Sequence, residues 1–228
     1  MYLFLTLAAG ILISLMAVLN GTLTAAVGLY LTTVIIHIIA ILFALLLLGI
    51  RKKSFVPKQK LPLWMYSGGF ISVLCTLCSN FAFGKISLIA ITALGLLAQT
   101  VTSLLIDCLG LFGVKKRRIR SVTWVCIAFS FCGIVYMLHG SEMSVFPAAA
   151  ASFAAGVGLA VSRMISASLA EYSGAVGGSL INHAVGLPFA AVLLFVIGGS
   201  ELAALPESLA AAPAWAYLGG IAGMLIIV

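Results

Sequence analysis

The chain has 228 residues, of which 64% are hydrophobic and only 7% are charged. This composition, with a mean hydropathy of +1.29, excludes a soluble globular protein, because a soluble core of this size cannot bury so many apolar side chains. The formal net charge of +7 does not indicate nucleic acid binding, since ten of the twelve basic residues fall in two short clusters between apolar runs. We therefore expect a single domain whose main partner is the lipid bilayer.

The apolar runs have the length needed to cross a membrane. A hydrocarbon core of ~30 Å requires roughly 20 helical residues. The runs are apolar on all sides, which favours helices over the alternating pattern of a β-barrel. We predict an all-α, polytopic transmembrane bundle with seven full spans and a partial eighth. The predicted runs are Tyr2 to Leu19, Ala25 to Ile50, Leu61 to Phe83, Ile86 to Phe112, Val122 to Leu138, Val145 to Leu169, Val176 to Ile197 and Trp215 to Val228.

The basic clusters predict the orientation of the bundle. Loops rich in Lys and Arg stay in the cytoplasm, and two predicted helices separate the clusters, so both clusters fall on the same side. Counting the spans back from the first cluster places the N-terminus in the cytoplasm as well. We therefore predict a multi-pass protein of the plasma membrane, which in bacteria is the inner membrane. The loop after the seventh run holds Glu201 and Glu207 and no basic residue, as expected of an external loop. The clusters comprise Arg51, Lys52, Lys53, Lys58 and Lys60, and Lys115, Lys116, Arg117, Arg118 and Arg120.

The sequence repeats itself. An offset of 146 residues aligns residues 7–48 with residues 153–194 without a gap, pairing Gly28 with Gly174 and His37 with His183. A Trp-x-Tyr-x-Gly-Gly motif at residues 64–69 recurs at residues 215–220. The predicted unit is therefore five helices long, with the first repeat at residues 1–139 and the second at residues 147–228.

An odd number of helices in each unit inverts the second copy in the membrane. Inverted repeats are typical of transporters, which bind solute near the bilayer midplane between the two units. The second copy lacks the equivalent of residues 78–139. We therefore expect this copy to be truncated, as in a fragment or a shortened reading frame.

Three stretches carry a family resemblance: Leu19-Asn20-Gly21, Gly68-Gly69 and the run from Gln99 to Asp107. With them the chain resembles the drug/metabolite transporter (DMT) superfamily, in particular its YdcZ-type branch, in which a five-helix unit occurs singly or duplicated. The resemblance implies a ten-helix bundle of inverted halves that moves small metabolites or drugs. The second copy departs from the pattern, because Ser166 stands where the first copy has Asn20.

Polar residues within the predicted spans are the candidate pathway residues, because polar groups are costly in lipid and usually face a bundle interior. Gln99, Ser103 and Asp107 are spaced at i, i+4 and i+8 and form one polar stripe. Such a stripe can line a pathway. Alternatively, Gln99 and Ser103 join neighbouring helices, and Asp107 is solvated or paired with Lys115 or Arg118.

The histidines His37 and His183 form the second candidate site. An inverted arrangement would place these repeat partners as a symmetric pair near the midplane, where they could carry protons or bind substrate. The alternative is a neutral imidazole bonded to a helix carbonyl or a serine. Asn20 and Asn80 are further candidates, which either contact solute or bridge helices.

Other features have structural interpretations. Arg163 is expected to snorkel to the cytoplasmic surface, and anion binding is the alternative. The glycine pairs Gly68-Gly69 and Gly219-Gly220 are expected to permit close helix approach. The cysteines are interpreted as packing residues, including the Cys75-x-x-Cys78 pair. The sequence contains no phosphate-binding loop, zinc motif or nucleophile elbow, so we expect no enzyme, no cofactor and no metal.

These patterns favour a secondary transporter of small metabolites or drugs that is coupled to protons or works by exchange. The alternative is a non-transporting membrane subunit or regulator that assembles with another membrane protein, which the truncated second copy favours. The identity of the substrate and the oligomeric state, including a homo-oligomer, stay open.

Overall fold

The computed structural model describes residues 2–52, 57, 60–139 and 142–227, and these residues form helices and short connections. The end of the last predicted run at Val228 lies outside the described residues. Short 3₁₀ turns occur at Leu63–Tyr66, Leu111–Gly113, Met143–Val145 and Ala214–Leu218. The α-helices are α1 (Tyr2–Val27), α2 (Leu29–Arg51), α3 (Ser67–Ala82), α4 (Leu88–Leu109), α5 (Ser121–Leu138), α6 (Phe146–Val196), α7 (Gly199–Ala203), α8 (Leu205–Ala211) and α9 (Gly219–Ile227).

Six of the described helices are long and apolar enough to cross a membrane. A seventh candidate span is the helix pair 205–211 and 214–225, which is bent by 96°. The count differs from the prediction of seven full spans because two predicted runs, Val145 to Leu169 and Val176 to Ile197, are joined in α6. A straight helix of its 51 residues would be roughly 77 Å long, more than twice the thickness of a hydrocarbon core.

Two glycines interrupt the helices at positions that the sequence repeat aligns. Gly28 separates α1 from α2 with φ 95° and ψ 169°, and Gly174 divides α6 into two arms with φ 73° and ψ 161°. This backbone region is essentially restricted to glycine. The predicted end of the first helix at Leu19 is wrong, because α1 continues through Asn20 and Gly21 until the chain reaches Gly28.

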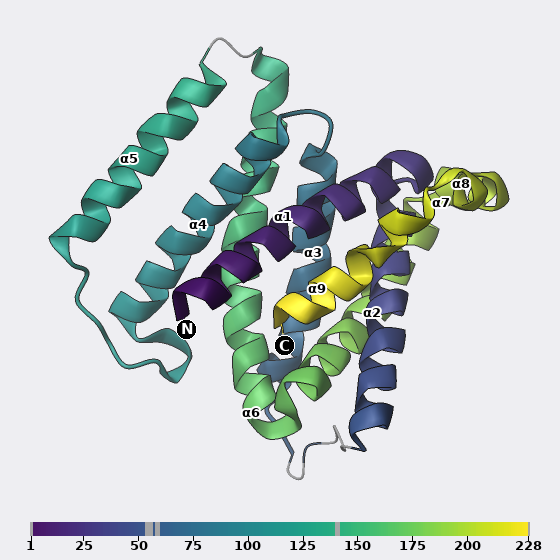
Figure 1. The fold of residues 1–228 in the computed structure, drawn as a ribbon, viewed down its shortest axis with the longest axis horizontal. Coiled ribbons are helices and arrows are strands. Elements are labelled where there is room, and N and C mark those ends of the chain that lie inside the picture. Colours follow the sequence, from purple (N-terminus) through teal and green to yellow (C-terminus); the bar gives the residue numbers. More distant parts are fainter. Residues whose placement is uncertain (1, 53–56, 58–59, 140–141, 228) are drawn as a thin grey trace.

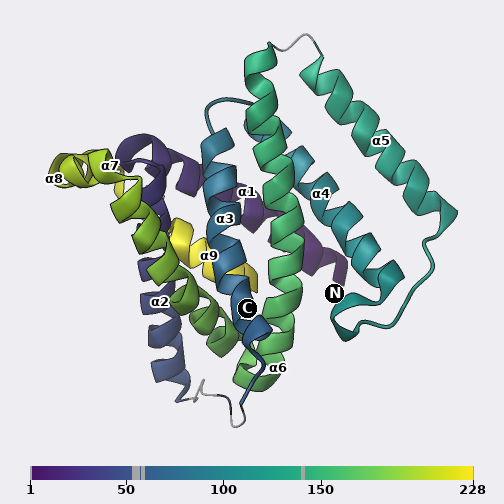
Figure 2. The same ribbon diagram turned by 180° about the vertical axis from the view of Figure 1, so that it is seen from behind.

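Most of the helices pack around a common centre, and α5 lies at the edge of the bundle (Figure 1 and Figure 2). Figure 1 shows α6 as two arms that meet at an acute angle near the lower edge, with α3 lying between them and α1 and α9 crossing in front. Seen from behind in Figure 2, α5 lies at this edge of the bundle, where it packs against α4 and is separated from most of the other helices. The C-terminal ends of α2 and α4 lie toward the same end of the bundle, whereas α7 and α8 project from the opposite end of α2.

Glycines bring the central helices into close contact, as the sequence predicted. A Cβ atom placed on Gly69 of α3 would collide with the carbonyl oxygen of Asn182 in the second arm of α6. A Cβ atom on Gly220 of α9 would lie 2.6 Å from the carbonyl oxygen of Ile36 in α2. Both contacts are tighter than a side chain permits, so small residues at these positions set the spacing between the helices.

Candidate functional site

A cavity of ≈ 170 Å³ lies in the centre of the bundle. Its walls come from α1, α2, α3, α4, both arms of α6 and the start of α9. Most of the accessible lining surface is apolar, although nearly half of the lining residues have polar or charged side chains. Five of the seven pathway candidates lie on this wall, namely Asn20, His37, Asn80, Gln99 and His183.

The two repeat-related histidines meet at this cavity. The ring centroids of His37 and His183 are 5.0 Å apart, with the rings at 74° to each other. His37 Nδ1 lies 2.8 Å from the carbonyl oxygen of Thr33. Because a carbonyl oxygen can only accept, Nδ1 carries the hydrogen, and Nε2 is left free to accept a hydrogen bond or a proton. The hydrogen bond to a helix carbonyl, expected in the alternative interpretation of His37, is present, and the contact with His183 lies beside it.

Several polar atoms near the pair have no hydrogen-bond partner within the described part of the chain. They include His37 Nε2, both ring nitrogens of His183, Asn20 Oδ1 and Asn80 Nδ2, all buried. Buried polar groups are normally paired with protein atoms, water or a bound ligand. A set of unpaired donors and acceptors on one cavity wall therefore fits a place where water or a solute completes the hydrogen bonding.

Other buried polar groups join helices directly. Ser162 in the first arm of α6 donates a hydrogen bond of 3.0 Å to the carbonyl oxygen of Gly68 in α3. Asn182 Nδ2 in the second arm donates to Ser166 Oγ in the first arm at 2.9 Å. These bonds tie both arms of α6 and α3 into one unit beside the cavity.

The polar stripe of α4 divides between two surroundings. Gln99 lines the cavity, and the cavity wall continues from it toward the N-terminal end of α4 through Gly95 and Thr92. Ser103 is exposed and Asp107 half-buried, and neither lines the cavity. The cavity-lining residues of α4 therefore all lie N-terminal to Ser103 and Asp107.

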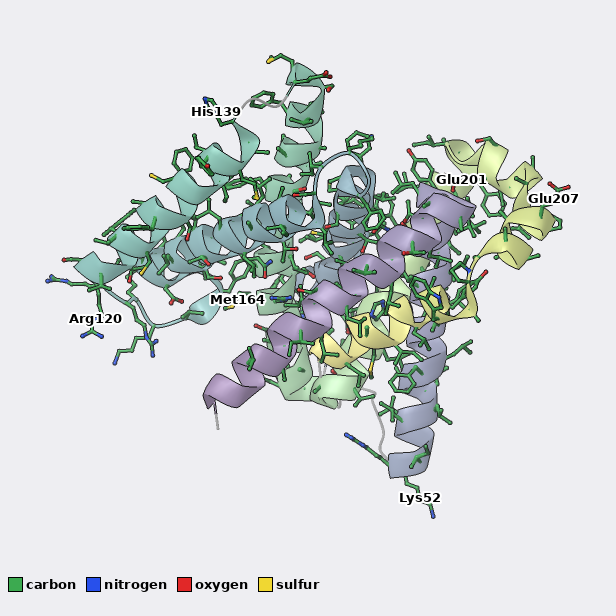
Figure 3. The ribbon with its side chains drawn as sticks, turned by 45° about the horizontal axis from the view of Figure 1, so that its top comes forward. Lys52, Arg120, His139, Met164, Glu201 and Glu207 are labelled. Atoms are coloured by element: carbon green, nitrogen blue, oxygen red, sulfur yellow. The ribbon has the colours of Figure 1, made fainter. Side chains whose placement is uncertain are left out.

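Arg163 takes a different position from the one expected. Its Nη1 atom donates a hydrogen bond of 2.7 Å to Gln99 Oε1, and the residue lines the cavity. The prediction that Arg163 snorkels to the cytoplasmic surface is wrong, because the guanidinium finds a neutral amide partner on α4 within the bundle. Figure 3 labels Met164, the residue after Arg163, and shows it far from Lys52, which belongs to the basic cluster at the end of α2.

Glu201 has a role that sequence reasoning missed. Its two carboxylate oxygens accept hydrogen bonds from the backbone N–H groups of Leu29 at 2.9 Å and Leu31 at 2.7 Å. A carboxylate at a helix N-terminus satisfies free donors and complements the helix dipole. Glu201 thus fastens α7 to the start of α2, at the corner where Figure 3 shows Glu201 and Glu207. The partners lie 172 and 170 residues away, so no local signal reveals them.

The described residues 2–52, 57, 60–139 and 142–227 contain no group of three His, Cys, Asp or Glu side chains placed to hold a metal ion. The polar side chains on the cavity wall are instead amides, hydroxyls, two imidazoles and one guanidinium. Such groups bind solutes by hydrogen bonding and charge.

A polytopic helical bundle with a central, partly polar cavity is a membrane protein of the kind that handles small solutes. The chain matches a family model described as "Putative inner membrane exporter, YdcZ" over residues 1–136 and 147–228. The chain therefore belongs to this family of multi-pass inner membrane proteins. The match confirms the family that its sequence motifs predicted. No curated protein and no solved structure gave a match to the chain.

Proposed function

We propose that this protein is a secondary transporter that exports small metabolites or drugs by alternating access between two inverted repeats. The observation that carries the proposal is the central cavity, whose wall joins residues of both repeats and holds the His37–His183 pair. Solute sites at the interface of two related units are a feature of secondary transporters.

Equivalent contacts support the repeat itself. Gly69 packs on the carbonyl oxygen of Asn182, and Gly220 packs on the carbonyl oxygen of Ile36. Asn182 and Ile36 are equivalent at the offset of 146 residues, and the two glycines are equivalent in the Trp-x-Tyr-x-Gly-Gly motif. In each case, the third helix of one repeat packs against the second helix of the other. Two interlocked units of this kind can rock against each other around a shared cavity.

The charge distribution supports an orientation with the N-terminus in the cytoplasm. Lys52 and Lys60 adjoin the α2–α3 connection and Arg120 precedes α5, whereas Glu201 and Glu207 lie at the opposite end of α2. Lys53 and Lys58 of the first cluster lie outside the described residues. An excess of basic residues on one side of a bundle is typical of its cytoplasmic side.

The histidine pair is our candidate for coupling transport to protons. His37 Nε2 and the nitrogens of His183 are unpaired within the described residues and can accept a proton. At a centroid distance of 5.0 Å, two positive charges in a low-dielectric interior repel each other strongly. The pair is therefore suited to hold one proton at a time, and a bound or released proton changes the charge of the cavity wall.

The proposal is tested by reconstituting the 228-residue chain in liposomes loaded with a panel of labelled small metabolites and drugs. We expect at least one solute to leave faster from these vesicles than from protein-free vesicles, and a transmembrane pH gradient to change the rate. A chain that moves no solute under either condition, and that purifies from membranes with one stoichiometric protein partner, would instead be a non-transporting subunit.

A further inference from the structure

Arg163 places a permanent positive charge on the wall of the cavity. A guanidinium stays protonated under all physiological conditions, and an unneutralised charge inside a bundle is costly. From this charge we infer that the cavity binds a small organic anion, whose charged group pairs with Arg163 while its apolar body occupies the rest of the space. This inference names the substrate class of the transporter and so rests on the proposed function.

The chain itself supplies no counter-charge at this place. The sequence holds five acidic residues, all of them among the described residues, and none lines the cavity. These residues are Asp107, Glu142, Glu171, Glu201 and Glu207. Within the described part of the chain, the hydrogen-bond partner of the Arg163 guanidinium is the neutral amide of Gln99. No acidic side chain of the described residues neutralises Arg163, so the site is open to an anion from another molecule.

Gln99 holds the guanidinium toward the cavity without consuming its charge. Gln99 Nε2 donates to the carbonyl oxygen of Gly95 at 3.2 Å, and Oε1 accepts from Arg163 Nη1 at 2.7 Å. A guanidinium has five N–H donors in a planar fork that matches a carboxylate. One donor is used on Gln99, so the fork keeps enough donors for a two-point contact with an anion.

The remainder of the wall fits an amphipathic ligand with one charged end. Asn80 offers an unpaired, buried Nδ2 donor at the same cavity. Ala17, the repeat-equivalent of Arg163, also lines the cavity, so the charge stands on one side only. Leu96 and Leu159 contribute apolar surface. A monoanion with an apolar body satisfies this arrangement better than an ion charged at both ends.

The size of the cavity limits the anion. At ≈ 170 Å³ it is close to a cavity of about 150 Å³ that accommodates benzene. A benzene-sized carboxylate is therefore a suitable probe, whereas a whole phospholipid is far too large. An anionic lipid could present only its headgroup, and the experiment has to separate this source from a dissolved anion.

The test measures equilibrium binding of benzoate and of benzamide, its neutral counterpart of nearly the same shape, to the purified 228-residue chain in a neutral detergent. We expect benzoate to bind at least ten-fold more tightly than benzamide. Arg163→Met should remove most of this preference, and Arg163→Lys should keep part of it. Arg120→Met is the matched control, because Arg120 is exposed outside the cavity, and its preference should equal that of the wild type.

Equal affinities of the wild type for benzoate and benzamide would overturn the inference, even if the Arg163 variants failed to fold. An unchanged preference in Arg163→Met would overturn it as well. Displacement of benzoate by phosphatidylglycerol, in the wild type but not in Arg163→Met, would show that the anion is a lipid headgroup and would refute a dissolved anion. Benzoate binding without any solute transport would contradict the proposed function and leave the anion site standing.

Discussion

The substitution Gly69→Ala tests the close packing that places α3 beside the cavity. The new Cβ would collide with the carbonyl oxygen of Asn182, lie 2.9 Å from the amide nitrogen of Gly186 and lie 3.1 Å from Val185 Cβ. The first two neighbours are backbone atoms, which cannot rotate away, so α3 and the second arm of α6 have to move apart. Overpacking of this kind costs about 1–3 kcal/mol. Alanine regains about 0.5–1 kcal/mol through its higher helix propensity.

Because two backbone atoms oppose the methyl group, we take the upper end of the packing cost and expect a net loss of about 2 kcal/mol. Gly133→Ala in α5 is the matched control, since a Cβ atom there has no neighbour within 4 Å. It should stabilise the protein by about 0.5–1 kcal/mol. Unfolding by an SDS titration in mixed micelles, followed by circular dichroism, measures both free energies. If Gly69→Ala proved as stable as Gly133→Ala, the close contact between α3 and α6 would be refuted.

Three further substitutions test the proton site, the tether of α7 and the helix break. His37→Ala should slow proton-dependent solute efflux from proteoliposomes at least ten-fold, whereas His139→Ala, an exposed histidine outside the cavity, should leave the rate within two-fold; equal rates in both variants would exclude the pair from coupling. Glu201→Gln removes the carboxylate from the N-terminus of α2 and should lower the free energy of unfolding by about 1 kcal/mol in the same SDS titration, and an unchanged value would refute the tether. Gly174→Ala should cost about 1–3 kcal/mol despite open space around the position, because its φ of 73° with ψ of 161° suits glycine alone; a neutral effect would contradict the observed break.

Part of the site could be predicted because the repeat carries spatial information. Aligning His37 with His183 predicted a symmetric pair, and the rings lie 5.0 Å apart. The motif glycines were predicted at helix contacts, and Gly69 and Gly220 lie at such contacts. These predictions depended on comparing one half of the chain with the other, which does not require knowledge of the packing within each half.

Arg163 and Glu201 could not be predicted in the same way. The position of Arg163 in its run, a few residues from the expected cytoplasmic end, was compatible with snorkelling, and its contact with Gln99 spans 64 residues. Glu201 was interpreted only as a charge in an external loop. The partners of both side chains lie on helices that are distant in the sequence. Because a long side chain can reach several positions, its partner is defined only when the helices are packed in the bundle.

By itself, the sequence determined that the chain lies in a membrane, that its spans are helices, which family it resembles and which residues align at an offset of 146. The tertiary structure decided that Gln99 faces the cavity while Ser103 and Asp107 do not, and that Arg163 joins Gln99. The physical reason is that helices in lipid are apolar on all sides, so their sequences lack the periodic contrast that marks the buried face of a soluble helix. Which faces meet depends on the fit of small residues between helices, and this fit depends on the whole bundle.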